Sequence, residues 1–158
     1  MTFTYSVTAH SQANPDAVYS ALVRAGTWPL WSPIDAVEVT AGSPDDAQRP
    51  GDTRVFRTGR AVSHERILEL AKDRRFVYEN TDGPFRFYRG VVELAPPYEG
   101  GTNIVWSAEF APKLPLTGPL WRSYLTRYMQ RMVQGLARYA EDAANQASGS
   151  PRSRPPTA

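Results

Sequence analysis

The sequence contains no cysteine and only two histidines, His10 and His64. Without cysteine the chain has no disulfide, no thiolate nucleophile and no zinc or iron–sulfur site built from cysteine ligands. Two histidines are too few for a histidine-rich metal site, so we expect no metal. A glycine-rich phosphate loop, a His-Glu-x-x-His pair and a Gly-x-Ser-x-Gly elbow are also missing, so we expect no cofactor. Cofactor-free chemistry or simple binding remains.

Long apolar runs and a strong charge imbalance are absent as well. No apolar run approaches the length of a membrane span, and residues 1–5 lack the basic-then-apolar layout of a signal peptide. We therefore expect a cytoplasmic protein without a membrane span. The 18 Lys and Arg exceed the 16 Asp and Glu only by Arg152 and Arg154, near the C-terminus. Because the other bases are spread along the chain, we do not expect nucleic acid as a partner.

The length and composition suit one globular domain. With 158 residues, of which 41% are hydrophobic, the chain can bury a sizeable core. From Ser148 onward it carries serine, proline and arginine but nothing to bury. We therefore predict a domain over residues 1–147 and a disordered tail over residues 148–158. A monomer and a homodimer are equally compatible with the sequence.

Helical signals occur near both ends of the chain. Asn14 and Pro15 are typical of a helix start, and apolar residues follow at helical spacing. The proline-bounded segment 27–33 predicts one or two further helical turns. A long C-terminal helix after Thr117 carries an apolar stripe. The stripe consists of Leu120, Tyr124, Leu125, Tyr128, Met132, Leu136, Tyr139 and Ala140.

Alternation with a period of two predicts the strands. One precedes the first helix, and six follow the short helical segment, separated by turn residues. Their ranges are 2–9, 37–39, 53–58, 62–70, 75–80, 85–94 and 103–110. The six later strands must be antiparallel neighbours because no connection is long enough for a crossover helix. We predict an α+β fold in which a curved antiparallel sheet of about seven strands wraps around the C-terminal helix and leaves a hollow for a ligand.

Several short motifs occur in an order found in one known family. They are Asn14–Tyr19 at the first helix, Trp28–Pro33 at the second, Gly83–Phe85 before a strand, and Gly100–Thr102 before the strand with Trp106. Over residues 3 to 143 the chain resembles the polyketide cyclase/dehydrase family of the START-like, helix-grip superfamily. The resemblance implies a helix-grip fold with an internal cavity for a small hydrophobic ligand, of polyketide or aromatic type.

The resemblance leaves several functions open, because this family includes aromatase/cyclases, lipid carriers and stress proteins. In the aromatase branch a tyrosine and an arginine are implicated in the chemistry, where this sequence has Ile34 and Leu70. The leading hypothesis is cofactor-independent cyclisation or dehydration of a polyketide-type ligand. The alternatives are a non-catalytic carrier or sensor of lipid-like molecules and an interaction protein with a filled cavity. A polar cluster deep in the cavity would favour the enzyme, and a dry cavity the carrier.

The candidate catalytic residues lie on two strands. On residues 62–70 the even positions hold three apolar residues, so we expect them to face the cavity together with His64 and Arg66. His64 could act as a general base and Arg66 could stabilise an enolate. Alternatively, both residues lie in solvent at the mouth of the cavity and have no catalytic role. On residues 85–94 alternation leaves the facing open. The resemblance favours the even set, which includes Arg86 and offers the Tyr88 hydroxyl to the cavity.

The candidate ligand-binding residues are mainly aromatic. They should converge between sheet and helix, either as the wall of a cavity or as a solid aromatic core. The set is Trp31 near the entrance, Arg86, Trp106, Ala108, Phe110, Tyr124, Tyr128 and Met132.

Overall fold

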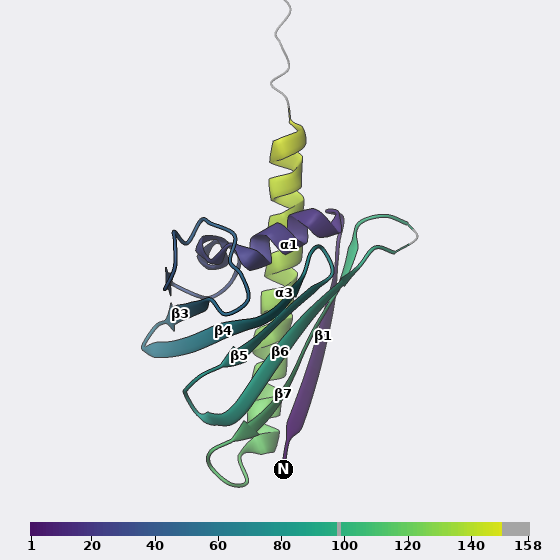
Figure 1. The fold of residues 1–158 in the computed structure, drawn as a ribbon. Helices are drawn as coiled ribbons and strands as arrows, with labels where there is room; N and C mark the ends of the chain where they lie inside the picture. Colours follow the sequence, from purple (N-terminus) through teal and green to yellow (C-terminus); the bar gives the residue numbers. More distant parts are fainter. Residues whose placement is uncertain (98, 150–158) are drawn as a thin grey trace, which may run out of the picture.

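The computed structural model describes residues 1–97 and 99–149 (Figure 1). One seven-stranded antiparallel sheet curves around a long C-terminal helix, α3 (Gly118–Ser148), which confirms the predicted helix-grip architecture. Of the predicted tail, residues 148–158, Ser148 is the last helical residue and 150–158 lie outside the described part of the chain. No helix within that part is both long and apolar enough to cross a membrane.

The strands follow the chain order except for the first. Their order across the sheet is β1-β7-β6-β5-β4-β3-β2, so β1 joins the sheet beside the last strand. Consecutive strands pair as antiparallel neighbours because only turns and short loops connect them. The strands are β1 (Phe3–Ser11), β2 (Ala36–Val39), β3 (Thr53–Thr58), β4 (Ala61–Ala71), β5 (Arg75–Asn80), β6 (Phe85–Ala95) and β7 (Thr102–Pro112).

Three short helical segments cover one end of the molecule, which we call the closed end. They are α1 (Pro15–Val23), a 3₁₀ turn (Ala25–Thr27) and α2 (Trp28–Trp31). Pro15 opens α1 as predicted, since a proline lacks the N–H that would be unpaired there. Where α2 crosses α3, a Cβ on Gly135 would overlap the Trp31 carbonyl oxygen. The lack of a side chain at that position allows the two helices to touch.

The core lies between the inner face of the sheet and α3. Leu125, Met132 and Leu136 of the predicted stripe are buried, but Leu120 and Tyr124 are exposed, which corrects the prediction for the first turns of the helix. These turns pass over the end of the molecule opposite the closed end, where the short helices provide no cover (Figure 1). We call this the open end.

Candidate functional site

A chamber of about 140 Å³ lies between the sheet and α3. Met129 and Met132 from α3 and Ile34 after α2 provide apolar walls, whereas Glu65 and Tyr88 from the sheet add polar groups. In other proteins an apolar cavity of about 150 Å³ holds a single benzene ring. The chamber therefore has room for a ring-sized group.

A wider vestibule of about 710 Å³ lies at the open end. It reaches from the β3–β4 and β5–β6 turns to the first turns of α3. Chamber and vestibule share six lining residues, namely Phe56, Thr58, Ser63, Asn80, Phe85 and Tyr128. A ligand can therefore place a ring in the chamber and a longer portion in the vestibule.

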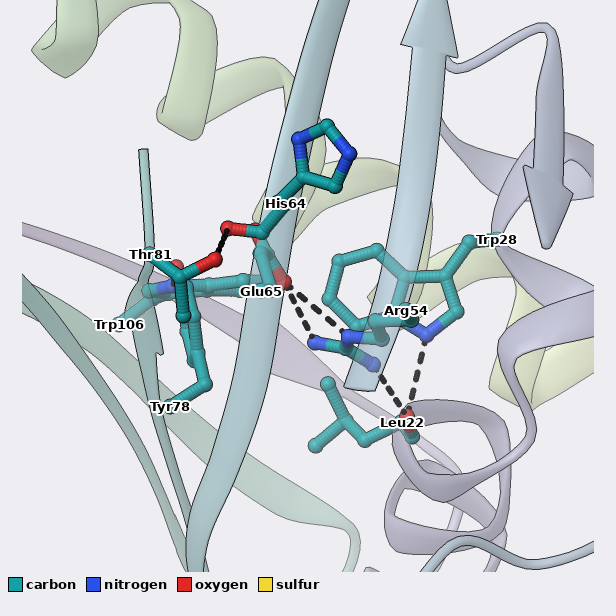
Figure 2. A network of polar contacts seen from close by, with 8 residues as sticks. All are labelled: Leu22, Trp28, Arg54, His64, Glu65, Tyr78, Thr81 and Trp106. Atoms are coloured by element: carbon teal, nitrogen blue, oxygen red, sulfur yellow. Dashed lines mark hydrogen bonds and ion pairs between the residues drawn. The ribbon is translucent and has the colours of Figure 1, made fainter. Parts of the chain in front are cut away.

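The polar centre of the site is a buried ion pair between Arg54 and Glu65 (Figure 2). The two residues oppose each other in the register of β3 and β4. Arg54 Nε donates to Glu65 Oε2 at 3.1 Å, and Nη2 lies 3.0 Å from the same oxygen at ion-pair distance. Among the described residues no hydrogen bond reaches Oε1. Since Glu65 lines the chamber, this oxygen remains available to a ligand.

Aromatic rings enclose the Arg54 guanidinium. Its Cζ lies 4.2 Å from the ring centroid of Trp28 and 4.8 Å from those of Phe56 and Phe76. Rings at this distance attract a cation through their quadrupole. Arg54 also donates from Nη1 to the Leu22 carbonyl at the end of α1, at 3.5 Å. The arginine therefore connects the closed end to the base of the chamber.

Burial acts on the pKa of both members of this pair. Desolvation raises the pKa of Glu65, and the attraction of Arg54 opposes that shift without cancelling it. Desolvation lowers the pKa of Arg54, against the attraction of Glu65. A carboxyl with a raised pKa beside a fixed cation can both accept and return a proton, which is the property of a general acid–base group.

Tyrosine hydroxyls extend the polar cluster. Tyr88 and Tyr5 form a hydrogen bond between their hydroxyls, and Trp106 Nε1 donates to the Tyr78 hydroxyl at 3.0 Å. Burial is the largest cause raising the pKa of all three tyrosines, so they are neutral phenols at ordinary pH. Neutral phenols can donate to a carbonyl or enolate oxygen of a ligand.

Gly90 makes room for this cluster. It opposes Tyr78 in the register of β5 and β6, and a Cβ at Gly90 would overlap the Tyr78 ring. The ring of Tyr78 lies across β6 only because position 90 has no side chain.

The predicted facing of His64 and Arg66 is wrong. Figure 2 shows Glu65, not His64, reaching toward Arg54. His64 Nδ1 instead lies 2.7 Å from the Asp82 carboxylate, Arg66 forms an ion pair with Glu79 at 2.9 Å, and neither residue lines the chamber or the vestibule.

The cause is a bulge in β4 between Ile67 and Glu69. It reverses the alternation, so Leu70 packs against the core on the same side as Glu65 and Ile67. Counting apolar residues across the bulge therefore assigned the wrong face.

The prediction for β6 is confirmed from Tyr88 onward. Tyr88, Gly90, Val92 and Leu94 all face inward. A second bulge, between Phe85 and Phe87, reverses the facing before them. Arg86 is consequently exposed and lines neither the chamber nor the vestibule, which corrects its assignment to the ligand site.

The remaining predicted ligand residues divide into three groups. Trp106, Tyr128 and Met132 line the chamber. Tyr124 lies outside it and lines only the vestibule. Three others are buried without lining either space: Trp31 packs on Trp28 and Trp106, Phe110 on Phe3 and Phe85, and Ala108 sits opposite Gly90.

The residues that sequence analysis missed are Arg54, Glu65 and Tyr78. A charged side chain is seldom fully buried, and a strand with arginine beside threonine and valine suggests exposure. The only local signal was that Arg54 and Phe56 share one face of β3. Pairing Arg54 with Glu65 requires the register of two strands, which the sequence does not specify.

Comparison with known proteins agrees with this architecture. The model of the family described as "Polyketide cyclase / dehydrase and lipid transport" matches residues 2–141. No curated protein matches the chain.

Two solved structures are similar over nearly their whole length. Ara h 8.0201 has a TM-score of 0.71 at 16% identity, covering 90% of this chain and 99% of that one. TTHA0849 from Thermus thermophilus has a TM-score of 0.64 at 22% identity, covering 93% and 100%. At these identities the likeness concerns the fold alone.

Proposed function

The chain belongs to the polyketide cyclase/dehydrase and lipid transport family, and on this premise we propose that it binds a small hydrophobic ligand of polyketide or aromatic type and catalyses its cyclisation or dehydration without a cofactor. The ligand places a ring or carbonyl-bearing end in the chamber and the rest of its chain in the vestibule. Glu65 takes the role of acid–base residue that the sequence suggested for His64.

The observation that carries the proposal is the arrangement of Glu65. Arg54 engages Oε2 and leaves Oε1 to the chamber, beside the phenols of Tyr78 and Tyr88. A carboxylate next to hydroxyl donors suits removal of a proton adjacent to a carbonyl group. The nearby phenols suit stabilisation of the oxygen that gains negative charge. This polar cluster deep in the cavity favours an enzyme over a carrier.

The proposed reaction begins when Glu65 takes a proton from a carbon next to a ligand carbonyl, giving an enolate whose oxygen accepts a hydrogen bond from Tyr88 or Tyr78. The enolate carbon attacks a second carbonyl of the same ligand and forms a C–C bond. The resulting alkoxide takes the proton back from Glu65. Loss of this hydroxyl with a neighbouring proton releases water and leaves a C=C bond, so no oxidant or reductant is consumed.

A non-catalytic carrier is the second candidate. The hydroxyls of Tyr5 and Tyr88 already bond each other, and that of Tyr78 accepts from Trp106. A carrier needs only apolar walls and one polar anchor, such as Asn80, whose Oδ1 is buried without a hydrogen-bond partner among the described residues. In an enzyme the loss of Glu65 lowers turnover, whereas in a carrier it changes only ligand affinity.

Ligand binding can be tested with 4-phenylphenol and with biphenyl, which lacks the hydroxyl. One ring fits the chamber and the other reaches the vestibule, and Trp106 on the chamber wall reports occupancy by fluorescence quenching. We expect 4-phenylphenol to bind about tenfold more tightly, because its hydroxyl donates to a charged group. In Glu65→Gln this preference should shrink, whereas in His64→Ala, the neighbour outside the chamber, it should persist. Equal affinities for the two probes in the wild type would contradict the assignment of Glu65 as polar anchor.

Catalysis can be tested on a synthetic poly-β-ketone thioester. Glu65→Gln should lower turnover by about 10²–10⁴-fold with little change in affinity for the thioester, because its ketone groups, unlike the hydroxyl of 4-phenylphenol, donate no hydrogen bond to Glu65 and proton transfer contributes only in the transition state. His64→Ala should retain turnover. If Glu65→Gln weakens binding of the thioester without loss of any reaction above background, the protein is a carrier.

A further inference from the structure

The rim of the vestibule exposes apolar side chains from one continuous segment of chain. Between the end of β7 and the second turn of α3, Leu114 is 69% exposed, Leu116 97%, Leu120 73% and Tyr124 56%. Single exposed leucines are ordinary, but an apolar cluster around a cavity mouth marks an interaction surface. We call Leu114, Leu116, Leu120 and Tyr124 the apolar rim.

The loop that carries this rim is held in place. The Lys113 backbone N–H donates to the Pro84 carbonyl at 2.9 Å, which ties the loop to the β5–β6 turn. The Thr117 hydroxyl donates to the Leu114 carbonyl at 2.7 Å. The leucines therefore project from a defined loop.

Leu116 is the most informative member of the rim. Its φ of 66° lies in the left-handed region. This backbone conformation costs any residue other than glycine about 1–3 kcal/mol. Its side chain is almost fully exposed and adds nothing to the core. A strained leucine with no folding role points to a contact outside the chain.

The segment of chain that carries the rim has charge of one sign. Residues 110–140 contain no aspartate or glutamate. Lys113, Arg122 and Arg127, all exposed, are in no ion pair with any described residue. Asp82 is the one acid among the residues that line the vestibule, and its carboxylate lies 2.7 Å from His64 Nδ1. The surface beside the apolar rim therefore suits an anionic partner.

We propose that the open end docks onto the surface of an anionic lipid bilayer. Leucines projecting from a loop can enter the boundary of headgroups and acyl chains, while the neighbouring cations meet lipid phosphates. A protein partner is less suited, since three of the four rim residues are leucines, which are under-represented at protein–protein hot spots. Leu114 and Leu120 also line the vestibule, so docking brings the cavity mouth to the bilayer.

Docking is tested by cosedimentation with phosphatidylcholine vesicles prepared with and without phosphatidylglycerol. The wild type should bind the anionic vesicles more tightly, with an affinity that falls as salt rises. Lys113→Gln and Arg122→Gln should each weaken binding about fivefold. Arg138→Gln, which lies sixteen residues and about 24 Å further along α3 than Arg122, should not. No vesicle binding, or equal binding to both vesicle types, would overturn the proposal.

The apolar part of the proposal has its own variants. Leu114→Ser combined with Leu116→Gly should weaken binding by about tenfold or more. Leu116→Gly also relieves the left-handed strain, so the variant remains folded. Leu30→Ser is a matched control, because Leu30 is 70% exposed but belongs to α2 at the closed end. An equal loss in the control, or association with an acidic protein in place of vesicles, would overturn the assignment of lipid. Because 4-phenylphenol binding is measured without vesicles, failure of docking and failure of the proposed function are distinguishable.

Discussion

The closed and open ends of this molecule differ in which side chains they bury and which they expose. At the closed end a charged side chain is buried among compensating contacts: Arg54 contacts Glu65, the Leu22 carbonyl and a ring of aromatic side chains. At the open end leucines are exposed and no described residue covers them. The first arrangement stabilises the fold around a chamber, whereas the second contributes little to folding. We therefore expect substitutions at the two ends to separate stability from interaction.

The largest effect should come from breaking the buried ion pair. Arg54→Met leaves the Glu65 carboxyl buried without its cation, which typically costs about 3–5 kcal/mol of unfolding free energy. Urea denaturation measures this loss. The double variant Arg54→Met with Glu65→Leu removes both charges and should recover most of the stability. If Arg54→Met is as stable as the wild type, the ion pair does not stabilise the closed end.

The next effect concerns the space that Gly90 provides. Gly90→Ala forces the Tyr78 ring to move, and we expect a loss of about 1–3 kcal/mol together with weaker 4-phenylphenol binding. In a Tyr78→Leu background the same substitution should cost less, because the planar ring is gone. Additive losses in this double-mutant cycle would show that position 90 acts independently of Tyr78.

The raised pKa of Glu65 predicts a pH dependence of stability. The folded state holds this proton more tightly than the unfolded chain, whose glutamates titrate near about 4.3. The stabilisation is complete below that value and is lost as pH rises through the folded pKa. Unfolding free energies measured across this range should therefore decrease for the wild type more than for the double variant lacking both charges. A wild-type slope no steeper than that of the double variant would contradict the shift.

The smallest effect should come from the open end. Leu120→Ala should change the unfolding free energy by no more than about 0.5 kcal/mol, because the side chain is exposed. Leu125→Ala, on the buried side of the same helix, should cost about 2–5 kcal/mol. Comparable losses at the two positions would show that the rim is part of the core.

Some features of the site could be predicted from the sequence because their signals are local. Trp106 and Met132 line the chamber as predicted, since each lies on the apolar face of a regular strand or helix. Tyr88 also lines it, as the family resemblance favoured where alternation left the facing of its strand open. The errors at His64 and Arg86 arise beside bulges, where one extra residue reverses every facing beyond it. The roles of Glu65 and Tyr88 in chemistry stay predictions until the variants are measured.

The sequence by itself determined the elements, their order and the helix-grip architecture, because hydrophobic period, turn residues and short connections act within a few positions of the chain. Only the tertiary structure decided which charges are buried. Arg54 and Glu65 are eleven residues apart and meet through the register of β3 and β4, a non-local property. Likewise, Leu120 continues an apolar stripe that is buried further along α3, yet it is exposed because the fold places no cover there. The local sequence pattern indicates whether a residue favours burial or exposure, and the packing of distant elements determines whether it is buried or exposed in the fold.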